Sequence, residues 1–163
     1  MANTFESRWA DKENAIGVPN DIRAEMVTYG DALLPSEAAP FLSFSDSSGQ
    51  KHIFEIFGFA EQWIDTERER LSEYIVLGSD GSGNPICERK SDKVIVLVDH
   101  EDGFKTVQFV NSSVQQLQES LLAYFGENDQ ELFLSVMRKL DPKAIEPETF
   151  WYFEAKGIGD DYT

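Results

Sequence analysis

The feature that most constrains the fold is an uninterrupted run of five apolar residues, Val94–Val98. A strand with one face in water alternates apolar and polar residues, whereas a continuous apolar run predicts a strand that is buried on both faces. Such a strand needs neighbouring strands beside it and helices packed against its sheet. The run therefore predicts a β-sheet at least partly covered by helices.

The sequence around this run is typical of an antiparallel meander. We expect four short strands, over Glu73–Ser79, Pro85–Arg89, Lys93–Asp99 and Phe104–Asn111. Turn-forming residues separate them, over Asp80–Asn84, Lys90–Asp92 and His100–Gly103. Gly78, Gly81 and Gly83 are expected to form turns, with positive φ in places.

Two amphipathic helices are expected after the meander. Ser113 and Gln116 have capping-box spacing ahead of an apolar stripe that ends at Gly126. A second helix is expected from residue 128 or 129 through Leu140, with Leu132, Phe133, Val136, Met137 and Leu140 on one face. The aromatic run Phe150–Phe153 favours a final helix, although an edge strand fits too, and its role as core or dimer contact is open.

The N-terminal half has weaker signals. Residues 1–18 resemble a polar lead-in, and Pro19, Asn20 and Asp21 predict a helix through about Tyr29, ended by Gly30. Ala32–Phe44 contains two prolines, so it is expected to be a packed connector without regular helix. A strand over His52–Phe59 and a solvated helix or loop over Glu61–Ser72 are expected next. The chain should form one domain with a core over about residues 19–156 and a loose tail over residues 157–163.

Charge restricts the class of partner. The chain has 30 acidic and 14 basic residues, a formal net charge of −16, and the excess is spread along the sequence. Such a surface repels nucleic acid and speeds encounter with a basic protein, although acidity that serves only solubility is the alternative. No segment is apolar enough for a membrane span or a signal peptide, and a single cysteine fits a reducing compartment. We therefore expect a cytoplasmic protein that binds neither nucleic acid nor membrane.

Catalytic and metal-binding motifs are missing from the sequence. The two histidines, His52 and His100, stand on different predicted elements without a neighbouring ligand motif. Asp80–Asn84 imitates the start of a calcium loop, but Pro85 stands where that loop needs glycine. Cys87 with His100 could supply a nucleophile and a base, although nothing near them marks an oxyanion hole. We expect no catalytic residues, no cofactor and no metal; a small hydrolase would require a deep pocket around Cys87 and His100.

Four segments together resemble the SUKH superfamily. The hairpin Tyr74–Cys87, with its Gly-Ser-Asp-Gly-Ser-Gly turn, is similar to the signature hairpin of that superfamily. Leu34-Pro35 followed by Pro40–Phe44 resembles its proline-containing connector, and Val96–Glu101 resembles its strand that ends in an acidic turn. Phe109–Leu117 resembles the strand and helix start of the fourth SUKH group, whose members serve as immunity proteins.

The resemblance implies a single α+β domain with a mixed, mainly antiparallel sheet flanked by helices. It also implies a non-enzymatic protein that neutralises a polymorphic bacterial toxin, frequently a nuclease, by tight binding in the cytoplasm of the producing cell. The acidic composition implies further that the toxin has a basic surface. The alternative is a scaffold or regulatory interaction domain, since the same fold occurs in a fungal cell-wall regulator.

The residues expected to contact a toxin are loop carboxylates near the hairpin turns and one aromatic anchor. They are Asp80, Glu88, Asp92, Glu101, Asp102 and Trp63. The alternative for each is that the carboxylate is only solvated and that Trp63 belongs to the core. Arg89 departs from the family pattern, in which an acidic residue is frequent at that place.

Overall fold

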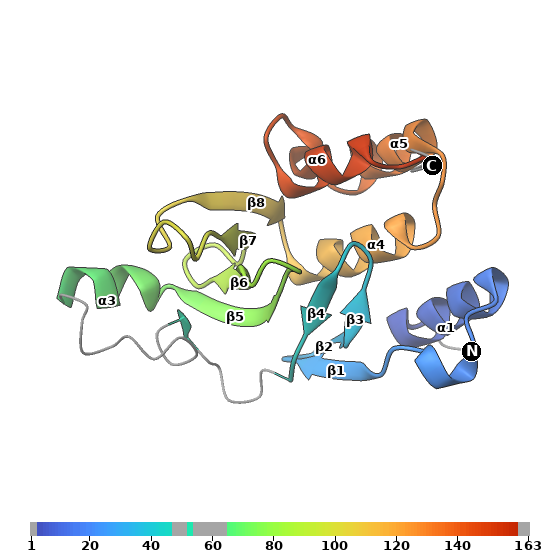
Figure 1. Ribbon diagram of the computed structural model, residues 1–163, viewed down its shortest axis with the longest axis horizontal. Coiled ribbons are helices and arrows are strands. Elements are labelled where there is room, and N and C mark those ends of the chain that lie inside the picture. The colour runs from blue at the N-terminus through green and yellow to red at the C-terminus, as the bar shows by residue number, and fades with distance from the viewer. Residues whose placement is uncertain (1–2, 47–51, 54–64, 160–163) are drawn as a thin grey trace.

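The computed structural model describes residues 3–46, 52–53 and 65–159, and Figure 1 shows its two β-sheets with helices around them. The strands are β1 (Met26–Tyr29), β2 (Ala32–Pro35), β3 (Glu37–Ala38), β4 (Leu42–Phe44), β5 (Tyr74–Ser79), β6 (Pro85–Arg89), β7 (Ile95–Val98) and β8 (Val107–Asn111). The helices are α1 (Phe5–Ile16), α3 (Asp65–Leu71), α4 (Val114–Tyr124), α5 (Gln130–Leu140) and α6 (Phe150–Lys156), with 3₁₀ turns η1 (Asn20–Ile22) and η2 (Pro142–Ile145).

The predicted meander is confirmed. Strands β5 to β8 pair in sequence order, and β3 and β4 extend the same sheet to six strands, while β1 and β2 form a separate hairpin. The combination of helices with these sheets confirms the α+β prediction. The predicted sheet was mixed and mainly antiparallel; in the described sheets every pairing is antiparallel. Among the described residues, no helix is long and apolar enough to cross a membrane.

The apolar run in β7 supplies side chains to both faces of the sheet, as predicted. Ile95 belongs to the larger core cluster, which includes the buried side chains of α4, α5 and α6. Val96 and Val98 belong to a smaller cluster on the other face, with Leu71 at the end of α3 and Phe104. Both clusters are buried, which explains why this strand has no polar residue.

Helices α4 and α5 begin where capping predicts. The Ser113 hydroxyl accepts a hydrogen bond from the Gln116 N–H, and Asp129 caps α5 in the same way through the Leu132 N–H. Gly126 follows α4 with a φ of 73°, a conformation that glycine adopts without strain. The apolar face predicted for α5 is only partly buried, because Leu132 and Val136 are exposed.

The aromatic run near the C-terminus is a helix that closes the core. Phe150 and Trp151 of α6 are buried, whereas Phe153 is 47% exposed. Ile158, in the segment predicted to be a loose tail, is also buried against the core. The core therefore continues two residues beyond the predicted limit at Lys156.

A buried hydrogen-bond network joins β8, α4 and α6 around Asn111. Its amide donates to Ser120 Oγ at 2.9 Å and to Asp141 Oδ2 at 3.0 Å, and its carbonyl oxygen accepts from Trp151 Nε1 at 2.9 Å. Asp141 also accepts from the Ser112 N–H and hydroxyl. These buried polar groups thus have the partners that burial requires.

The N-terminal predictions need two corrections. Residues 5–16 of the predicted lead-in form α1, with Thr4 as N-cap, and the side chain of Trp9 is buried in the larger core cluster. The helix predicted from Pro19 to Tyr29 is wrong: Asn20–Ile22 is a single 3₁₀ turn and Met26–Tyr29 is a strand. Propensity and start signals gave way here to pairing with β2, which needs an extended backbone.

The connector Ala32–Phe44 lacks regular helix, as expected, but forms three strands. Leu34, Leu42 and Phe44 are buried, as expected for a packed connector, whereas Phe41 is 86% exposed and departs from that expectation. Of the three glycines predicted to form turns, Gly83 has a positive φ of 87°. Gly78 instead lies within β5, where an added Cβ would stand 1.9 Å from the Ser43 carbonyl oxygen, so it permits close approach of β4.

Candidate functional site

Three of the predicted contact carboxylates lie at the same end of the meander. Asp80 is in the β5–β6 turn, and Glu101 and Asp102 are in the β7–β8 connection. The two connections touch, because Asn84 Oδ1 accepts from the His100 N–H at 3.0 Å and lies 2.6 Å from His100 Nδ1. We call Asp80, Glu101 and Asp102 the turn-end carboxylates.

Two of these carboxylates also shape their own loops. Asp80 Oδ1 accepts from the Ser82 and Asn84 N–H groups, each at 2.9 Å. Asp102 accepts from the N–H groups of Lys105 and Thr106, and its hydrogen bond with the Thr106 hydroxyl is the main reason that the pKa of Asp102 lies below its usual value. Glu101 is exposed.

The other two predicted carboxylates lie near the opposite end of the meander, around the β6–β7 turn. Glu88 accepts from the Tyr29 hydroxyl at 2.9 Å and is mostly covered. Asp92 forms a two-bond pair with Arg89, which lowers the pKa of Asp92. The structure therefore does not bring the five carboxylates together, and Trp63 lies outside the described residues.

The Cys87 and His100 pair has no catalytic geometry. Cys87 is fully buried in the smaller core cluster, and burial raises the pKa of its thiol, which opposes formation of the thiolate nucleophile. His100 is bound to Asn84 in the turn. Within the described ranges, no group of three or more His, Cys, Asp or Glu side chains could hold a metal ion.

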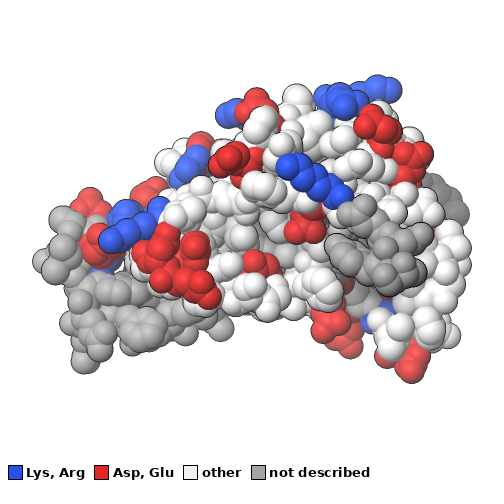
Figure 2. Space-filling view, turned by 45° about the horizontal axis from the view of Figure 1, so that its top comes forward, with Lys and Arg blue, Asp and Glu red and all other residues white. Residues whose placement is uncertain are grey.

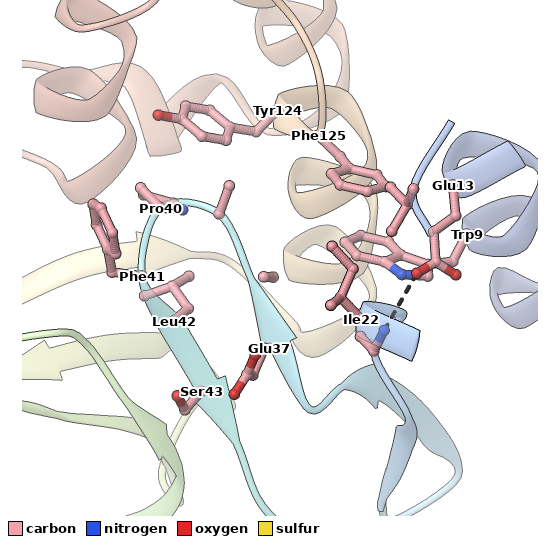
Figure 3. A pocket seen from close by; sticks show the side chains of 14 residues that line it. Trp9, Glu13, Ile22, Glu37, Pro40, Phe41, Leu42, Ser43, Tyr124 and Phe125 are labelled. Atoms are coloured by element: carbon pink, nitrogen blue, oxygen red, sulfur yellow. Dashed lines mark hydrogen bonds between the residues drawn. The ribbon is translucent and has the colours of Figure 1, made fainter. Parts of the chain in front are cut away.

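A cavity of about 690 Å³ lies between α1, the β3–β4 hairpin and the C-terminal end of α4 (Figure 3). We call it the α1 pocket. Its walls are mainly apolar and aromatic, with Trp9, Ile22, Pro40, Phe41, Tyr124 and Phe125 among them. Trp9 and Phe125 stack with ring centroids 4.5 Å apart and planes 5° from parallel. No motif in the sequence marks this pocket, because its lining residues come from distant segments of the chain.

The described residues that line the α1 pocket include two glutamates and no Lys or Arg. Glu13 is 6% exposed, and its carboxylate accepts from the Ala24 N–H at 3.3 Å (Figure 3). Glu37 at β3 is exposed. Trp9, one helical turn before Glu13, has a buried indole N–H with no hydrogen-bond partner among the described residues.

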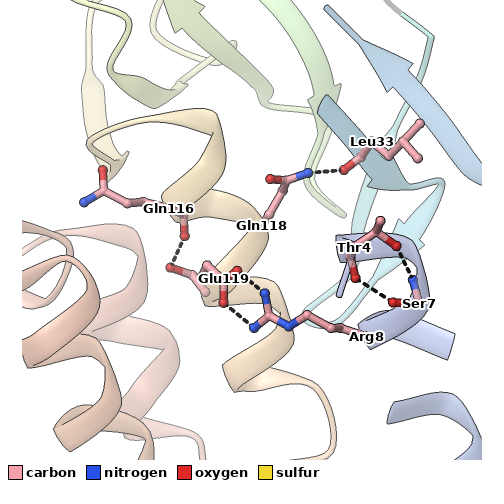
Figure 4. A network of polar contacts seen from close by, with 8 residues as sticks. Thr4, Ser7, Arg8, Leu33, Gln116, Gln118 and Glu119 are labelled. Atoms are coloured by element: carbon pink, nitrogen blue, oxygen red, sulfur yellow. Dashed lines mark hydrogen bonds and ion pairs between the residues drawn. The ribbon is translucent and has the colours of Figure 1, made fainter. Parts of the chain in front are cut away.

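Helix α1 is held in place beside α4 by side-chain contacts (Figure 4). Arg8 forms a two-bond ion pair with Glu119, one bond of which spans 2.6 Å. Gln118 on the same helix donates to the Leu33 carbonyl oxygen in β2 at 2.7 Å. Helix α1, which carries Trp9 and Glu13, is thereby tied to α4, and α4 is tied to the β1–β2 hairpin.

The mouth of the α1 pocket is continuous with the turn end of the sheet. Phe41 lines the pocket and also stands beside Gly81 of the β5–β6 turn, where an added Cβ would lie 3.1 Å from the Phe41 Cβ. Phe41 has a φ of 60°, which is uncommon and strained for a bulky residue.

In Figure 2, acidic side chains appear in several separate places on the visible face, with fewer basic ones between them.

Comparisons with known proteins give one family. The SUKH-4 immunity protein family matches residues 10–154, a range that includes both the meander and most of the α1 pocket. No curated protein and no solved structure matches the chain.

Proposed function

The chain belongs to the SUKH-4 immunity protein family, and we propose that it protects the cell that makes it by binding a protein toxin tightly in the cytoplasm. The family match carries this proposal. Immunity proteins of this family are generally non-enzymatic, and the burial of Cys87 agrees with a function through binding.

The proposed toxin has a basic surface. A net charge of −16 attracts a cationic partner at long range and repels phosphate backbones. Steering of this kind raises association rates by roughly ten to a thousand times at low salt and weakens as salt screens the charges. Salt dependence of the association rate is therefore part of the proposal.

The proposed contact surface is the turn end of the meander together with Phe41. The turn-end carboxylates Asp80, Glu101 and Asp102 supply an acidic rim, and the exposed ring of Phe41 supplies an apolar anchor beside it. Trp63 remains a proposed second anchor. Glu88 and Asp92 are weaker candidates, because Tyr29 and Arg89 already occupy their oxygen atoms.

The proposal is tested first by purifying the tagged protein from its native cytoplasm at low and at moderate salt and identifying what it retains. The retained polypeptide is then produced in cells with and without the immunity protein. We expect one basic polypeptide in stoichiometric amount, which stops growth when produced alone and is harmless with its partner. Retention of non-toxic housekeeping proteins instead would favour the scaffold or regulatory function.

The contact surface is tested with two sets of amide substitutions in the same binding assay. The test set is Asp80→Asn, Glu101→Gln and Asp102→Asn. The single amide oxygen at positions 80 and 102 can still accept the backbone N–H hydrogen bonds that Oδ1 accepts now. The matched control set is Glu88→Gln and Asp92→Asn at the other end of the sheet. We expect the test set to slow association at least tenfold at low salt and the control set to change it little; equal effects would exclude the turn end as the contact surface.

A further inference from the structure

We propose that the α1 pocket receives an arginine side chain of the toxin. This inference rests on the proposed function and adds to it the residue type that the surface recognises. Its starting point is Glu13, a residue that is 6% exposed, in a pocket whose described lining residues include no Lys or Arg.

The position of Glu13 is unfavourable for the free protein. A carboxylate near the C-terminus of a helix faces the negative end of the helix dipole, and α1 has no basic residue in its last turn. The carboxylate accepts a 3.3 Å hydrogen bond from the Ala24 N–H, and it has no ion pair within residues 3–46, 52–53 and 65–159. Burial of a charge without a cation is costly, so the site is completed by a cationic group from outside.

The indole N–H of Trp9 is the second incomplete group on this wall. Its donor is buried without a described partner, a condition that destabilises a folded protein. Trp9 and Glu13 are four residues apart on α1 and so lie on the same helix face. A partner segment that brings a guanidinium to Glu13 can also bring a backbone carbonyl oxygen to this N–H.

The shape and lining of the pocket favour arginine over lysine. Arginine has a long apolar stem, which suits walls formed by Ile22, Pro40 and Leu42. Its planar guanidinium stacks on aromatic rings such as Phe125, which lies on the α1 side of the pocket, and two of its N–H groups can bond the Glu13 carboxylate together (Figure 3). Lysine offers a compact, strongly hydrated charge without the planar fork that fits both oxygens of one carboxylate.

The basic residues next to Glu13 and Ala24 in the sequence, Lys12 and Arg23, have other partners. Lys12 Nζ donates to the Phe125 carbonyl oxygen at 3.3 Å, and Arg23 Nε donates to the Val18 carbonyl oxygen at 3.1 Å. Neither lines the pocket. A self-contained alternative, in which Arg23 turns into the pocket, makes a distinct prediction: Arg23→Gln should then strengthen binding of an added arginine.

The inference is tested without the toxin by titrating the full-length protein with N-acetyl-arginine methylamide and following amide and indole N–H signals by NMR. The matched control ligand is the citrulline derivative, which has the same shape and no charge. We expect saturable shifts of the Trp9 indole and of the Glu13 and Phe41 amides with the arginine ligand, and affinity at least tenfold lower for citrulline, because a hydrogen bond to a charged group contributes about 1.5–3 kcal/mol.

Variants of the protein then test which carboxylate binds the arginine ligand. Glu13→Gln should weaken the arginine ligand about tenfold, whereas Glu131→Gln on the exposed side of α5 should leave its affinity unchanged. Arginine shifts that map to the turn-end carboxylates, equal affinity for citrulline, or unchanged affinity in Glu13→Gln would each overturn the inference. This titration is independent of toxin protection: its failure with protection intact refutes the pocket alone, and loss of protection with pocket binding intact refutes the proposed function.

Discussion

Two buried polar clusters lie near opposite ends of helix α4, and they differ in how completely their hydrogen bonds are formed. Around Asn111 and Asp141, four hydrogen bonds have lengths of 3.0 Å or less. On the wall of the α1 pocket, the Trp9 N–H has no described partner and Glu13 accepts one long hydrogen bond. A paired cluster stabilises the fold, whereas an unpaired one lowers stability and retains the capacity to bind.

The largest expected effect comes from breaking the paired cluster. Asp141→Ala leaves the Ser112 N–H and the Asn111 amide buried without their acceptor, so we expect a loss of about 3 kcal/mol in the free energy of unfolding. Urea denaturation measures this, with the exposed Glu101→Ala as a control that should change stability by less than about 0.5 kcal/mol. A result for Asp141→Ala equal to that control would show that the cluster does not stabilise the fold.

A matched pair of tryptophans isolates the hydrogen bond itself. Trp151 and Trp9 are both buried, but only the Trp151 indole N–H has a described partner, at Asn111. Replacing each by phenylalanine removes a similar volume, so we expect Trp151→Phe to cost about 1–2 kcal/mol more than Trp9→Phe. Equal costs in urea denaturation would mean that the two clusters do not differ in the way described.

The pocket carboxylate should behave in the opposite way to Asp141. Glu13→Gln removes a buried charge at an unfavourable helix end and retains an oxygen for the Ala24 N–H, so we expect unchanged stability or a gain of up to about 1 kcal/mol. The thermal unfolding midpoint measures this, and a clear loss of stability would show that Glu13 already has a favourable role in the free protein.

The smallest expected effect concerns Glu154 of α6, a partly buried carboxylate that belongs to neither polar cluster. Burial, and then the charge of Asp80, raise the pKa of Glu154 in the folded protein. The folded state therefore holds this proton more tightly than the unfolded state, and stability falls as pH rises from the ordinary glutamate pKa through the raised one. Glu154→Gln should flatten this part of the stability profile and raise the unfolding midpoint slightly at neutral pH only; a profile parallel to that of the original protein would contradict this.

The sequence predicted the second half of the fold well because its signals there are local. The continuous apolar run of β7, the capping pair of α4 and the acidic cap of α5 each fix one element through neighbours in the chain. In the first half the deciding interactions are distant: β1 forms because it pairs with β2, and α1 is held by Glu119. Thr4 as N-cap, with Phe5 and Trp9 four residues apart and Gly17 after the helix, was a usable signal for α1.

The candidate site was less predictable than the fold. Sequence position suggested that five turn carboxylates act together, but alternate turns of a meander lie at opposite ends of a sheet, which separates Glu88 and Asp92 from Asp80. The α1 pocket combines residues from α1, from the β3–β4 hairpin and from the end of α4, which are more than a hundred positions apart at the extremes. Only tertiary structure brings them together.

Because Cys87 is buried, labelling of its thiol can report on opening of the sheet. Its thiol lies in the central strand β6 with no exposed surface, so a thiol reagent can reach it only when the sheet opens. The labelling rate in an excess of reagent therefore measures how often the meander opens, with no introduced probe. Comparing the labelling rate with and without a bound partner would show whether binding at the surface makes opening of the meander rarer.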